Sequence, residues 1–257
     1  MPVQGSPFVW YELMTTDPAA AQDFYRAVVG WSAQVFPTGP SPYTILSANG
    51  RGVAGLMQLP QEACDAGARP GWMGYIGTPD VDAATAKVSA GGGTVHRPPD
   101  DIPTVGRFSV VADPQGAVFT LFTPLPGTEE APVPPMTEGH GAWHELMATD
   151  WSSAFDFYAS QFGWTKGETM DMGEMGTYQL FGAGGEPLGG MMTKPPEAPA
   201  PFWLYYFSVP ALDRAIAEVT ARGGQVIFGP MSVPGDAWVV QCEDPQGAAF
   251  ALVSMNR

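Results

Sequence analysis

The pattern of apolar and polar positions predicts a strand followed by a helix at the start of the chain. Residues 8–16 alternate bulky apolar side chains with other side chains, which is typical of a strand with two different faces. Asp17 and Pro18 follow, and these residue types favour the N-cap and the first turn of a helix. Apolar residues then recur three and four positions apart until Gly30, so we expect one helix with a single apolar face.

The next segments predict short strands. Residues 31–36, 43–48 and 52–58 have the composition of strands and are separated by Pro and Gly turns. With the first strand and helix they make one βαβββ unit. After an expected loop at 59–71 comes a second unit, with a strand at 72–78, a helix at 82–90 and strands near 94, at 107–112 and at 117–122.

This two-unit pattern occurs twice along the chain. The stretch Trp10–Asp17 (WYELMTTD) is matched in the second half by Trp143–Asp150 (WHELMATD). The run Asp113–Ala117 (DPQGA) is matched by Asp244–Ala248 at a slightly smaller offset, so the loops have absorbed a small change of length. The second half should therefore repeat the scheme, with helices at 150–162 and 213–222.

The period is far too long for a solenoid, so we interpret the chain as two copies of one small domain. Residues 1–124 are assigned to the first domain, the Pro-rich segment 125–137 to a linker, and residues 138–257 to the second domain. A chain of 257 residues has room for two domains that each bury a core. The expected fold class is α+β.

Composition and charge limit the classes of partner. Hydrophobic residues make up 45% of the chain and charged residues 14%, as in a globular protein. The net charge of -15 would repel nucleic acid and anionic membranes and favour neutral or cationic ligands, although it also serves solubility. The sequence offers neither a leader nor a long apolar run, so we expect a cytoplasmic protein. Cys64 and Cys242 are not equivalent in the two copies, which argues against a disulfide or a thiolate metal site.

Each half opens with a strand, an Asp and a helix, and closes on Asp-Pro-x-Gly followed by Ala-x-Phe-x-Leu. This order resembles the vicinal oxygen chelate superfamily, which includes glyoxalase I, bleomycin-resistance proteins and extradiol dioxygenases. The Trp-x-Glu-Leu opening and the Phe-Tyr…Gly-Trp helix exit are similar to tandem two-domain members labelled glyoxalase-like or hydroxylase. The resemblance implies two tandem domains, in each of which two βαβββ units form a mixed sheet curled into a cup, with the helices outside.

The resemblance also implies where metal ligands would stand. Those positions are Trp10 and Trp143 on the first strand, residues 72–73 and 203–204 on the fifth strand, and Thr120 and Ala251 on the last strand. Protein metal sites of this kind need imidazole, thiolate or carboxylate ligands, and these positions supply none. We therefore expect no catalytic metal. The sequence also carries no phosphate-binding Gly loop or dinucleotide fingerprint, so no cofactor is expected.

Two carboxylates are the candidate functional groups. Glu12 and Glu145 stand two residues beyond Trp10 and Trp143, and therefore on the same strand face. A carboxylate beside an indole in a partly closed cup would have a raised pKa and could act as a general base or anchor a cationic ligand. The alternative is a structural role, with the carboxylates hydrogen-bonded to Tyr hydroxyls or to the backbone. Both interpretations stay open.

His144 replaces Tyr11 in the second copy, and strand alternation places it on the helix-packed face, where a structural role is expected. A register shift of one residue would bring it into the cup. Side chains suited to planar ligands complete the candidate ligand-binding set, with ordinary core packing as the alternative for each. They are Trp72, Tyr75, Arg107, Trp203, Tyr206 and Trp238, together with Trp10 and Trp143.

These features favour a metal-independent small-molecule binding protein similar to bleomycin-resistance proteins, with cups that bind an aromatic or cationic ligand. The alternative is a glyoxalase-like enzyme, such as a lyase, isomerase, hydroxylase or dioxygenase, with Glu12 or Glu145 as the base. A regulatory or scaffold module is a third option. The duplication predicts a monomer with an internal pseudo-dimer, and a homodimer is also compatible with the sequence.

Overall fold

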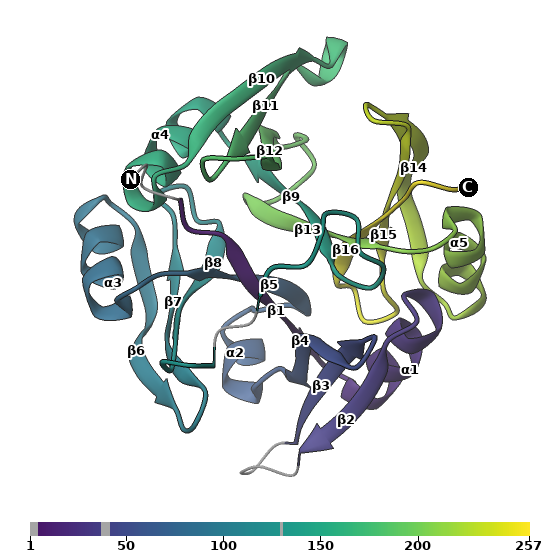
Figure 1. Ribbon diagram of the computed structural model, residues 1–257, viewed down its shortest axis with the longest axis horizontal. Helices are drawn as coiled ribbons and strands as arrows, with labels where there is room; N and C mark the ends of the chain where they lie inside the picture. Colours follow the sequence, from purple (N-terminus) through teal and green to yellow (C-terminus); the bar gives the residue numbers. More distant parts are fainter. Residues whose placement is uncertain (1–4, 37–41, 129–130) are drawn as a thin grey trace. The chain divides into compact units, whose positions relative to one another are not determined.

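The computed structural model describes residues 5–36, 42–128 and 131–257, and within them each repeat forms two βαβββ modules (Figure 1). The elements of the first repeat are β1 (Phe8–Thr15), α1 (Pro18–Val28), β2 (Ser32–Phe36), β3 (Tyr43–Ala48), β4 (Arg51–Gln58), α2 (Gln61–Asp65), β5 (Gly71–Gly77), α3 (Val81–Ala90), β6 (Thr94–Ile102), β7 (Gly106–Ala112) and β8 (Val118–Pro124).

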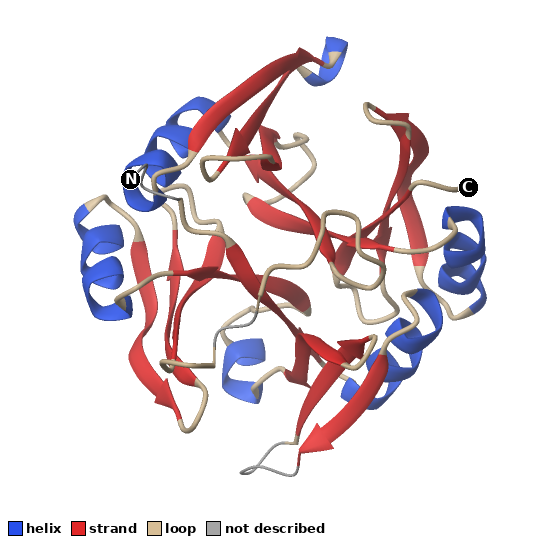
Figure 2. Ribbon diagram, in the orientation of Figure 1, coloured by secondary structure: helices blue, strands red, loops and turns tan. Residues whose placement is uncertain are grey.

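The second repeat has the same order of strands and main helices (Figure 2). Its elements are β9 (Gly141–Ala148), α4 (Trp151–Phe162), β10 (Thr165–Asp171), the 3-10 turn η1 (Gly173–Met175), β11 (Thr177–Gly182), β12 (Pro187–Thr193), β13 (Phe202–Ser208), α5 (Leu212–Ala221), β14 (Gln225–Val233), β15 (Ala237–Glu243) and β16 (Ala249–Ser254).

The predicted α+β class and the four βαβββ modules are confirmed. The short helix α2 lies inside the expected loop at 59–71 and was not predicted. Its five residues are too few to give a periodic apolar pattern. Residues 129–130 of the predicted linker lie outside the described residues. Across the described ranges, no helix is long and apolar enough to span a lipid bilayer.

The strands of the described chain form two mixed sheets of eight. The strand order is β2-β3-β4-β1-β5-β8-β7-β6 in the first and β10-β11-β12-β9-β13-β16-β15-β14 in the second. β1 pairs with β4 in parallel and β5 pairs with β8 in parallel, whereas the pairs β2–β3, β3–β4, β6–β7 and β7–β8 are antiparallel. The mixed sheet that the family resemblance implied is thus confirmed.

The compact units of the chain do not follow the two repeats. Unit 1 consists of Met1–Val9, Gly74–Pro132 and His144–Trp203, and unit 2 consists of Trp10–Met73, Val133–Trp143 and Leu204–Arg257. Each unit therefore combines one module from each repeat. In unit 1, α3 lies against β6, β7 and β8, and in unit 2, α5 lies against β14, β15 and β16 (Figure 1).

A buried Trp–Tyr–Asp chain, called the interlock below, joins the two modules of unit 2. Tyr25 on α1 is fully buried, accepts a hydrogen bond from Trp72 Nε1 at 2.9 Å and donates one to Asp244 Oδ2 at 3.1 Å. The other carboxylate oxygen of Asp244 accepts the N–H groups of Gln246 and Ala248, both at 2.9 Å. The repeated Phe-Tyr motif of one repeat thus binds the Asp-Pro-Gln-Gly turn of the other.

Unit 1 contains the same interlock with the repeats exchanged. Tyr158 on α4 accepts a hydrogen bond from Trp203 Nε1 at 3.0 Å and donates one to Asp113 Oδ2 at 3.2 Å. Asp113 Oδ1 accepts the N–H groups of Gln115 and Ala117 at 2.8 and 3.0 Å. Burial raises the pKa of both Asp113 and Asp244, and these hydrogen bonds work in the opposite direction.

The interlock identifies the strand face that packs towards the helices. Tyr11 packs against Phe207 with ring centroids 5.5 Å apart, and Phe207 packs against Trp72, which bonds Tyr25 of α1. Because side chains alternate along a strand, Glu12 lies on the opposite side of β1. We call that side the far face.

The same argument holds for β9 in unit 1. His144 stacks on Phe8 at 4.0 Å, and Phe8 packs against Trp203, which bonds Tyr158 of α4. His144 therefore lies on the helix side, as strand alternation predicts, and Glu145 lies on the far face of its module.

Candidate functional site

On the far face of unit 2, Glu12 is paired with a tyrosine. Glu12 is only 6% exposed, and its Oε2 accepts a hydrogen bond from Tyr43 Oη at 3.0 Å. Tyr43 Oη in turn accepts the indole N–H of Trp10 at 3.3 Å. Burial, together with the charge of Glu12, raises the pKa of Tyr43 above its ordinary value. The phenol therefore stays protonated and remains a donor to the carboxylate.

A glycine makes this pair sterically feasible. In the parallel register of β1 and β4, Glu12 lies opposite Gly55, and Tyr43 reaches over β4 from the neighbouring strand β3. A Cβ atom at position 55 would overlap the Tyr43 hydroxyl. Gly55 is thus required for close approach rather than for an unusual backbone angle.

Unit 1 repeats the arrangement residue for residue. Glu145 is 6% exposed and its Oε2 accepts a hydrogen bond from Tyr178 Oη at 2.9 Å. Glu145 lies opposite Gly190 in the β9–β12 register, and a Cβ atom at position 190 would overlap the Tyr178 ring. We call each carboxylate, tyrosine and glycine an anchor set, namely Glu12, Tyr43 and Gly55, and Glu145, Tyr178 and Gly190.

Methionines flank both anchor sets. Met57 lies opposite Tyr43 and also opposite Met14, so these three side chains share one row across β3, β4 and β1. In the second repeat the corresponding row contains Tyr178, Met192 and Met147. The row continues to Phe36 on β2 in the first repeat and to Met170 on β10 in the second.

The anchor set combines a buried carboxylate with a phenol donor on an otherwise apolar strand face. A carboxylate in such a place accepts hydrogen bonds and attracts cations, and the phenol fixes its orientation. The bond from Tyr43 or Tyr178 is of the type expected if the carboxylates are structural. The role of Glu12 and Glu145 as base or ligand anchor stays a prediction.

The metal-ligand positions implied by the resemblance do not fit a metal ion. Trp10 lies beside the Glu12–Tyr43 pair, Thr120 lies opposite Tyr75 in the β5–β8 register, and Ala251 occupies the position of Thr120 in the second repeat. In the part of the chain that the structure describes, no group of three or more His, Cys, Asp and Glu side chains is arranged to hold a metal ion. The residues present therefore offer no ligand set of this kind.

The remaining predicted aromatic residues divide between the two strand faces. Trp72 and Trp203 belong to the interlocks, on the helix side, so the structure does not bring them to the anchor sets. Tyr206 is buried and accepts a hydrogen bond from Gln241 Nε2 at 3.0 Å. Tyr75 is buried opposite Thr120, and Trp143 is half-buried two residues before Glu145 on β9. By strand alternation Tyr75, Tyr206 and Trp143 are far-face residues.

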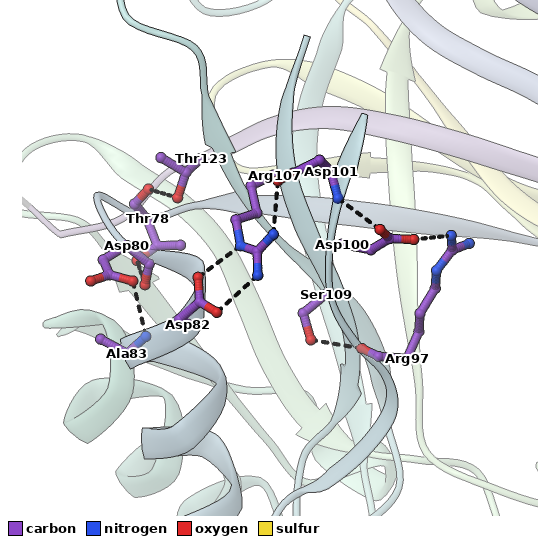
Figure 3. A network of polar contacts seen from close by, with 10 residues as sticks. All are labelled: Thr78, Asp80, Asp82, Ala83, Arg97, Asp100, Asp101, Arg107, Ser109 and Thr123. Atoms are coloured by element: carbon purple, nitrogen blue, oxygen red, sulfur yellow. Dashed lines mark hydrogen bonds and ion pairs between the residues drawn. The ribbon is translucent and has the colours of Figure 1, made fainter. Parts of the chain in front are cut away.

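Arg107 belongs to a surface ion-pair network (Figure 3). Its guanidinium donates to both carboxylate oxygens of Asp82 on α3, at 2.7 and 3.0 Å, and to Asp101 at 2.8 Å. The side chain is 36% exposed. These acidic partners hold the Arg107 side chain against α3, and its part in a ligand site stays a prediction.

Trp238 takes the place of Arg107 in the second repeat and has a similar surface role. The guanidinium of Arg257 lies over the Trp238 ring, 4.7 Å from its centroid, and bonds Asp213 on α5 at 2.9 Å. Asp213 is the counterpart of Asp82. A cation is thus retained at this surface although a different residue supplies it, and the ligand-lining role of Trp238 stays a prediction.

His144 is held in a buried aromatic environment. Its Nδ1 lies 2.6 Å from the carbonyl oxygen of Leu188, and its ring stacks on Phe8. Burial lowers the pKa of His144 to about 4, so the ring is neutral at physiological pH. This placement suits a structural group, although the sequence also offered His144 as a ligand-binding residue.

The sequence analysis missed the tyrosines and glycines of the anchor sets. A signal was present, because Tyr43, Gly55 and Met57 recur as Tyr178, Gly190 and Met192, all at one constant offset. This offset is slightly larger than those of the first-strand and turn matches, since the hairpin between β2 and β3 changed length. A residue-by-residue alignment at a single offset overlooks them.

Comparison with known sequences agrees with the fold. A family model described as "Glyoxalase/Bleomycin resistance protein/Dioxygenase superfamily" matches residues 8–121 and 138–252. The chain is 34% identical to "Putative glyoxylase CFP32" of Mycobacterium tuberculosis over 253 residues, which cover 97% of this chain and 95% of the relative. It is 31% identical to "Anthracycline biosynthesis protein DnrV" of Streptomyces peucetius over 266 residues, covering 98% and 94%.

Solved structures share the architecture at low sequence identity. The Mn(II)-bound glyoxalase from Novosphingobium aromaticivorans has a TM-score of 0.66 and 16% identity, covering 100% of this chain and 83% of that one. The 2,2',3-trihydroxybiphenyl 1,2-dioxygenase from Sphingomonas wittichii strain RW1 has a TM-score of 0.67 and 13% identity, covering 98% and 90%. With both repeats matched by the family and the fold shared, the chain belongs to the glyoxalase/bleomycin resistance protein/dioxygenase superfamily.

Proposed function

We propose that the protein binds a small aromatic or cationic molecule without a metal, and that each anchor set supplies a polar contact for it. The observation that carries this proposal is the duplication of the anchor set. Glu, Tyr and Gly, with a methionine row beside them, recur in both repeats although much of the surrounding sequence differs. A buried carboxylate costs stability, so its retention in two copies favours a use for its charge.

The surroundings of the carboxylates suit such a ligand. Methionine side chains adapt to irregular shapes, and their sulfur atoms contact aromatic rings favourably. Indole and phenol rings attract cations by about 0.5 to 2 kcal/mol. The net charge of -15 would also draw cations towards the protein.

The name of one relative gives less specific support for an aromatic ligand. The Streptomyces peucetius relative is named an anthracycline biosynthesis protein. A planar aromatic ligand would match the methionine and aromatic side chains of the far face.

A second candidate is an enzyme that uses Glu12 or Glu145 as a general base. The specific observation in its favour is the phenol that orients each carboxylate, because a base needs a fixed geometry towards the proton it removes. The Mycobacterium tuberculosis relative is also named as a glyoxylase. In this case Tyr43 and Tyr178 would be positioning residues.

The test uses a matched pair of probes, the planar cation N-methylacridinium and neutral acridine at pH 8, titrated by calorimetry. We expect the cation to bind more tightly, Glu12→Gln and Glu145→Gln each to weaken it unequally, and the double variant to abolish the preference. Glu168→Gln, on the exposed strand β10, is the control and should bind like the parent.

Melting temperatures of the same variants distinguish the outcomes. Unchanged affinity together with a large fall in melting temperature would show that the carboxylates are structural. Loss of turnover in an activity screen with unchanged binding would instead favour the general base.

A further inference from the structure

The Glu12 anchor set has a further member, because Trp10 starts a chain of hydrogen bonds that ends on the carboxylate. The indole Nε1 of Trp10 donates to Tyr43 Oη at 3.3 Å, and Tyr43 Oη donates to Glu12 Oε2 at 3.0 Å. An indole N–H can only donate, and a phenol carries a single proton. The direction of both bonds is therefore fixed, with Tyr43 as acceptor in the first and donor in the second.

Two glycines of β4 leave room for the two rings of this chain. A Cβ atom on Gly52 would lie 3.4 Å from the Trp10 ring, so the indole rests on the strand. A Cβ atom on Gly55 would overlap the Tyr43 hydroxyl. Trp10 and Glu12 are two positions apart on β1 and share the far face, and Tyr43 comes from β3. Three strands thus bring the donor, the phenol and the carboxylate together.

Both bonds favour the charged form of Glu12. The carboxylate is only 6% exposed, and burial by itself favours the neutral form. A donated hydrogen bond works against burial, and hydrogen bonds in series strengthen one another. Without the indole, the Tyr43 hydroxyl would be free to rotate and to accept a hydrogen bond from another donor. Trp10 therefore decides whether the Tyr43 proton stays directed at the carboxylate.

We propose that Trp10 is a positioning residue of the Glu12 anchor set, and that it gives the site its preference for a cation over a neutral molecule of the same shape. It acts through Tyr43. The inference rests on the proposed function and adds to it the group that holds the carboxylate charged and oriented. The sequence suggested Trp10 as a ligand contact, and the role inferred here is a different one.

The experiment measures the ratio of the affinities for N-methylacridinium and neutral acridine at pH 8 by calorimetry. Every variant also carries Glu145→Gln, so that unit 2 alone keeps a charged anchor set. We expect Trp10→Phe to lower this ratio by about two- to tenfold, the range of one net hydrogen bond. Trp151→Phe, at a half-buried tryptophan of α4, is the matched control and should leave the ratio unchanged.

Phenylalanine also attracts cations less strongly than tryptophan does, and a second background separates this effect. With Tyr43→Phe the chain is already broken, so adding Trp10→Phe should change the ratio by less than about twofold. An equal fall in both backgrounds would overturn the inference, because the indole would then attract the cation directly. An unchanged ratio in the background that keeps Tyr43 would overturn it as well.

The indole N–H proton resonance of Trp10 tests the chain without any ligand, and its absence in Trp10→Phe assigns it. Tyr43→Phe should move this resonance upfield, because the acceptor is lost. Glu12→Gln should move it in the same direction, since a weaker acceptor at the end of the chain weakens both bonds. A resonance that responds to Tyr43→Phe but not to Glu12→Gln would show that the chain does not reach the carboxylate, which contradicts the inference.

Failure of the proposed function would look different. Glu12→Gln, in the same Glu145→Gln background, would then leave the affinity ratio unchanged, and both proposals would fall. A ratio that depends on Glu12 but does not change in Trp10→Phe would overturn the role of Trp10 alone.

Discussion

Units 1 and 2 are built from the same parts, and the comparison between them separates what the duplication kept from what it changed. Both units contain the Trp–Tyr–Asp interlock and the Glu–Tyr–Gly anchor set with nearly equal hydrogen-bond lengths. The interlock joins modules from different repeats, and the anchor set places a charge on an apolar face. Both need several residues at once, so a single substitution in either is costly.

The outer strands differ much more. In unit 1, β6 carries an exposed ion pair between Arg97 and Asp100. In unit 2, the corresponding strand β14 exposes Val226, Ile227 and Phe228 by 37%, 59% and 43%. Each of these strands has register irregularities against its neighbour, which blunt a sheet edge whatever its side chains are. Edge composition was therefore free to change.

At one pair of neighbouring positions the two units differ in which residue has the larger side chain. Tyr11 in unit 2 has room because Gly141 lies beside it, and a Cβ atom there would overlap the Tyr11 hydroxyl. In unit 1 the counterpart of Gly141 is Phe8, and the counterpart of Tyr11 is the smaller His144, which stacks on Phe8. The pair changed together, because close packing tolerates swaps that conserve volume.

The largest expected effect comes from breaking an interlock. Asp244→Ala in unit 2, or Asp113→Ala in unit 1, leaves two backbone N–H groups and one Tyr hydroxyl without their acceptor. We expect each to lower the free energy of unfolding by about 4 kcal/mol, since each buried donor left unsatisfied costs about 1 to 3 kcal/mol. Urea denaturation measures it, with the exposed Asp156→Ala as control. A loss no greater than that of the control would contradict the role of the interlock.

The next largest expected effect is a pH dependence of stability, because His144 stands where the first repeat has Tyr11. Burial lowers the pKa of His144 from 6.5 to about 4, so the unfolded chain binds a proton that the folded chain does not. As far as His144 is concerned, the folded protein therefore has its full stability above pH 6.5 and loses stability as the pH falls towards 4. With a shift of this size the loss is on the order of 3 kcal/mol.

His144→Phe removes the titrating ring and keeps an aromatic surface for Phe8. Comparing the parent and His144→Phe isolates this term from the other groups that titrate in acid. We expect the difference between their unfolding free energies to narrow as the pH falls from 7 to 4. A difference that stays constant across this range would show that the His144 ring has the same pKa in the folded protein as in the unfolded chain.

A smaller effect sharpens the comparison of the anchor sets. Gly55→Ala forces the Tyr43 hydroxyl away from Glu12, and Gly190→Ala acts in the same way on Tyr178. Overpacking of this kind costs about 1 to 3 kcal/mol. Adding Tyr43→Phe to Gly55→Ala should recover part of the stability, because the overlapping oxygen is gone, without restoring acridinium binding. Full recovery of binding would show that the tyrosine does not position the carboxylate.

The sequence alone predicts the modules and the positions of Glu12 and Glu145 well. Helix starts depend on local signals, such as Asp17 before Pro18, and strand alternation fixes which face each first-strand residue occupies. These features need no knowledge of the partner strand. They can therefore be predicted without knowledge of the tertiary contacts.

Two kinds of feature cannot be predicted from local sequence patterns. The partner of Glu12 is Tyr43, on another strand 31 residues away, and only the register of β3 on β4 shows it. Arg107 was expected in a cup, but its place is decided by Asp82 and Asp101, whose positions depend on how α3 packs on the sheet. The pairing of modules into units likewise depends on side chains from both repeats.

The smallest effect comes from a helix start that the two units do not share. Asp80 caps α3 in unit 1 by accepting the Ala83 N–H at 3.0 Å, whereas Ala211 stands at the start of α5 in unit 2 with a methyl group that cannot accept a hydrogen bond. The backbone at Ala211, with φ of -149° and ψ of 120°, is close to that of Asp80, so Ala211→Asp needs no rearrangement.

We expect Ala211→Asp to raise the free energy of unfolding, and Asp80→Ala to lower it, each by about 1 kcal/mol. Thermal and urea denaturation measure both changes. Ala211→Ser is the neutral control for the added negative charge. A gain with Ser but not with Asp would mean that charge repulsion outweighs the cap in a chain of net charge -15, and no gain with either would mean that the first N–H groups of α5 are already satisfied.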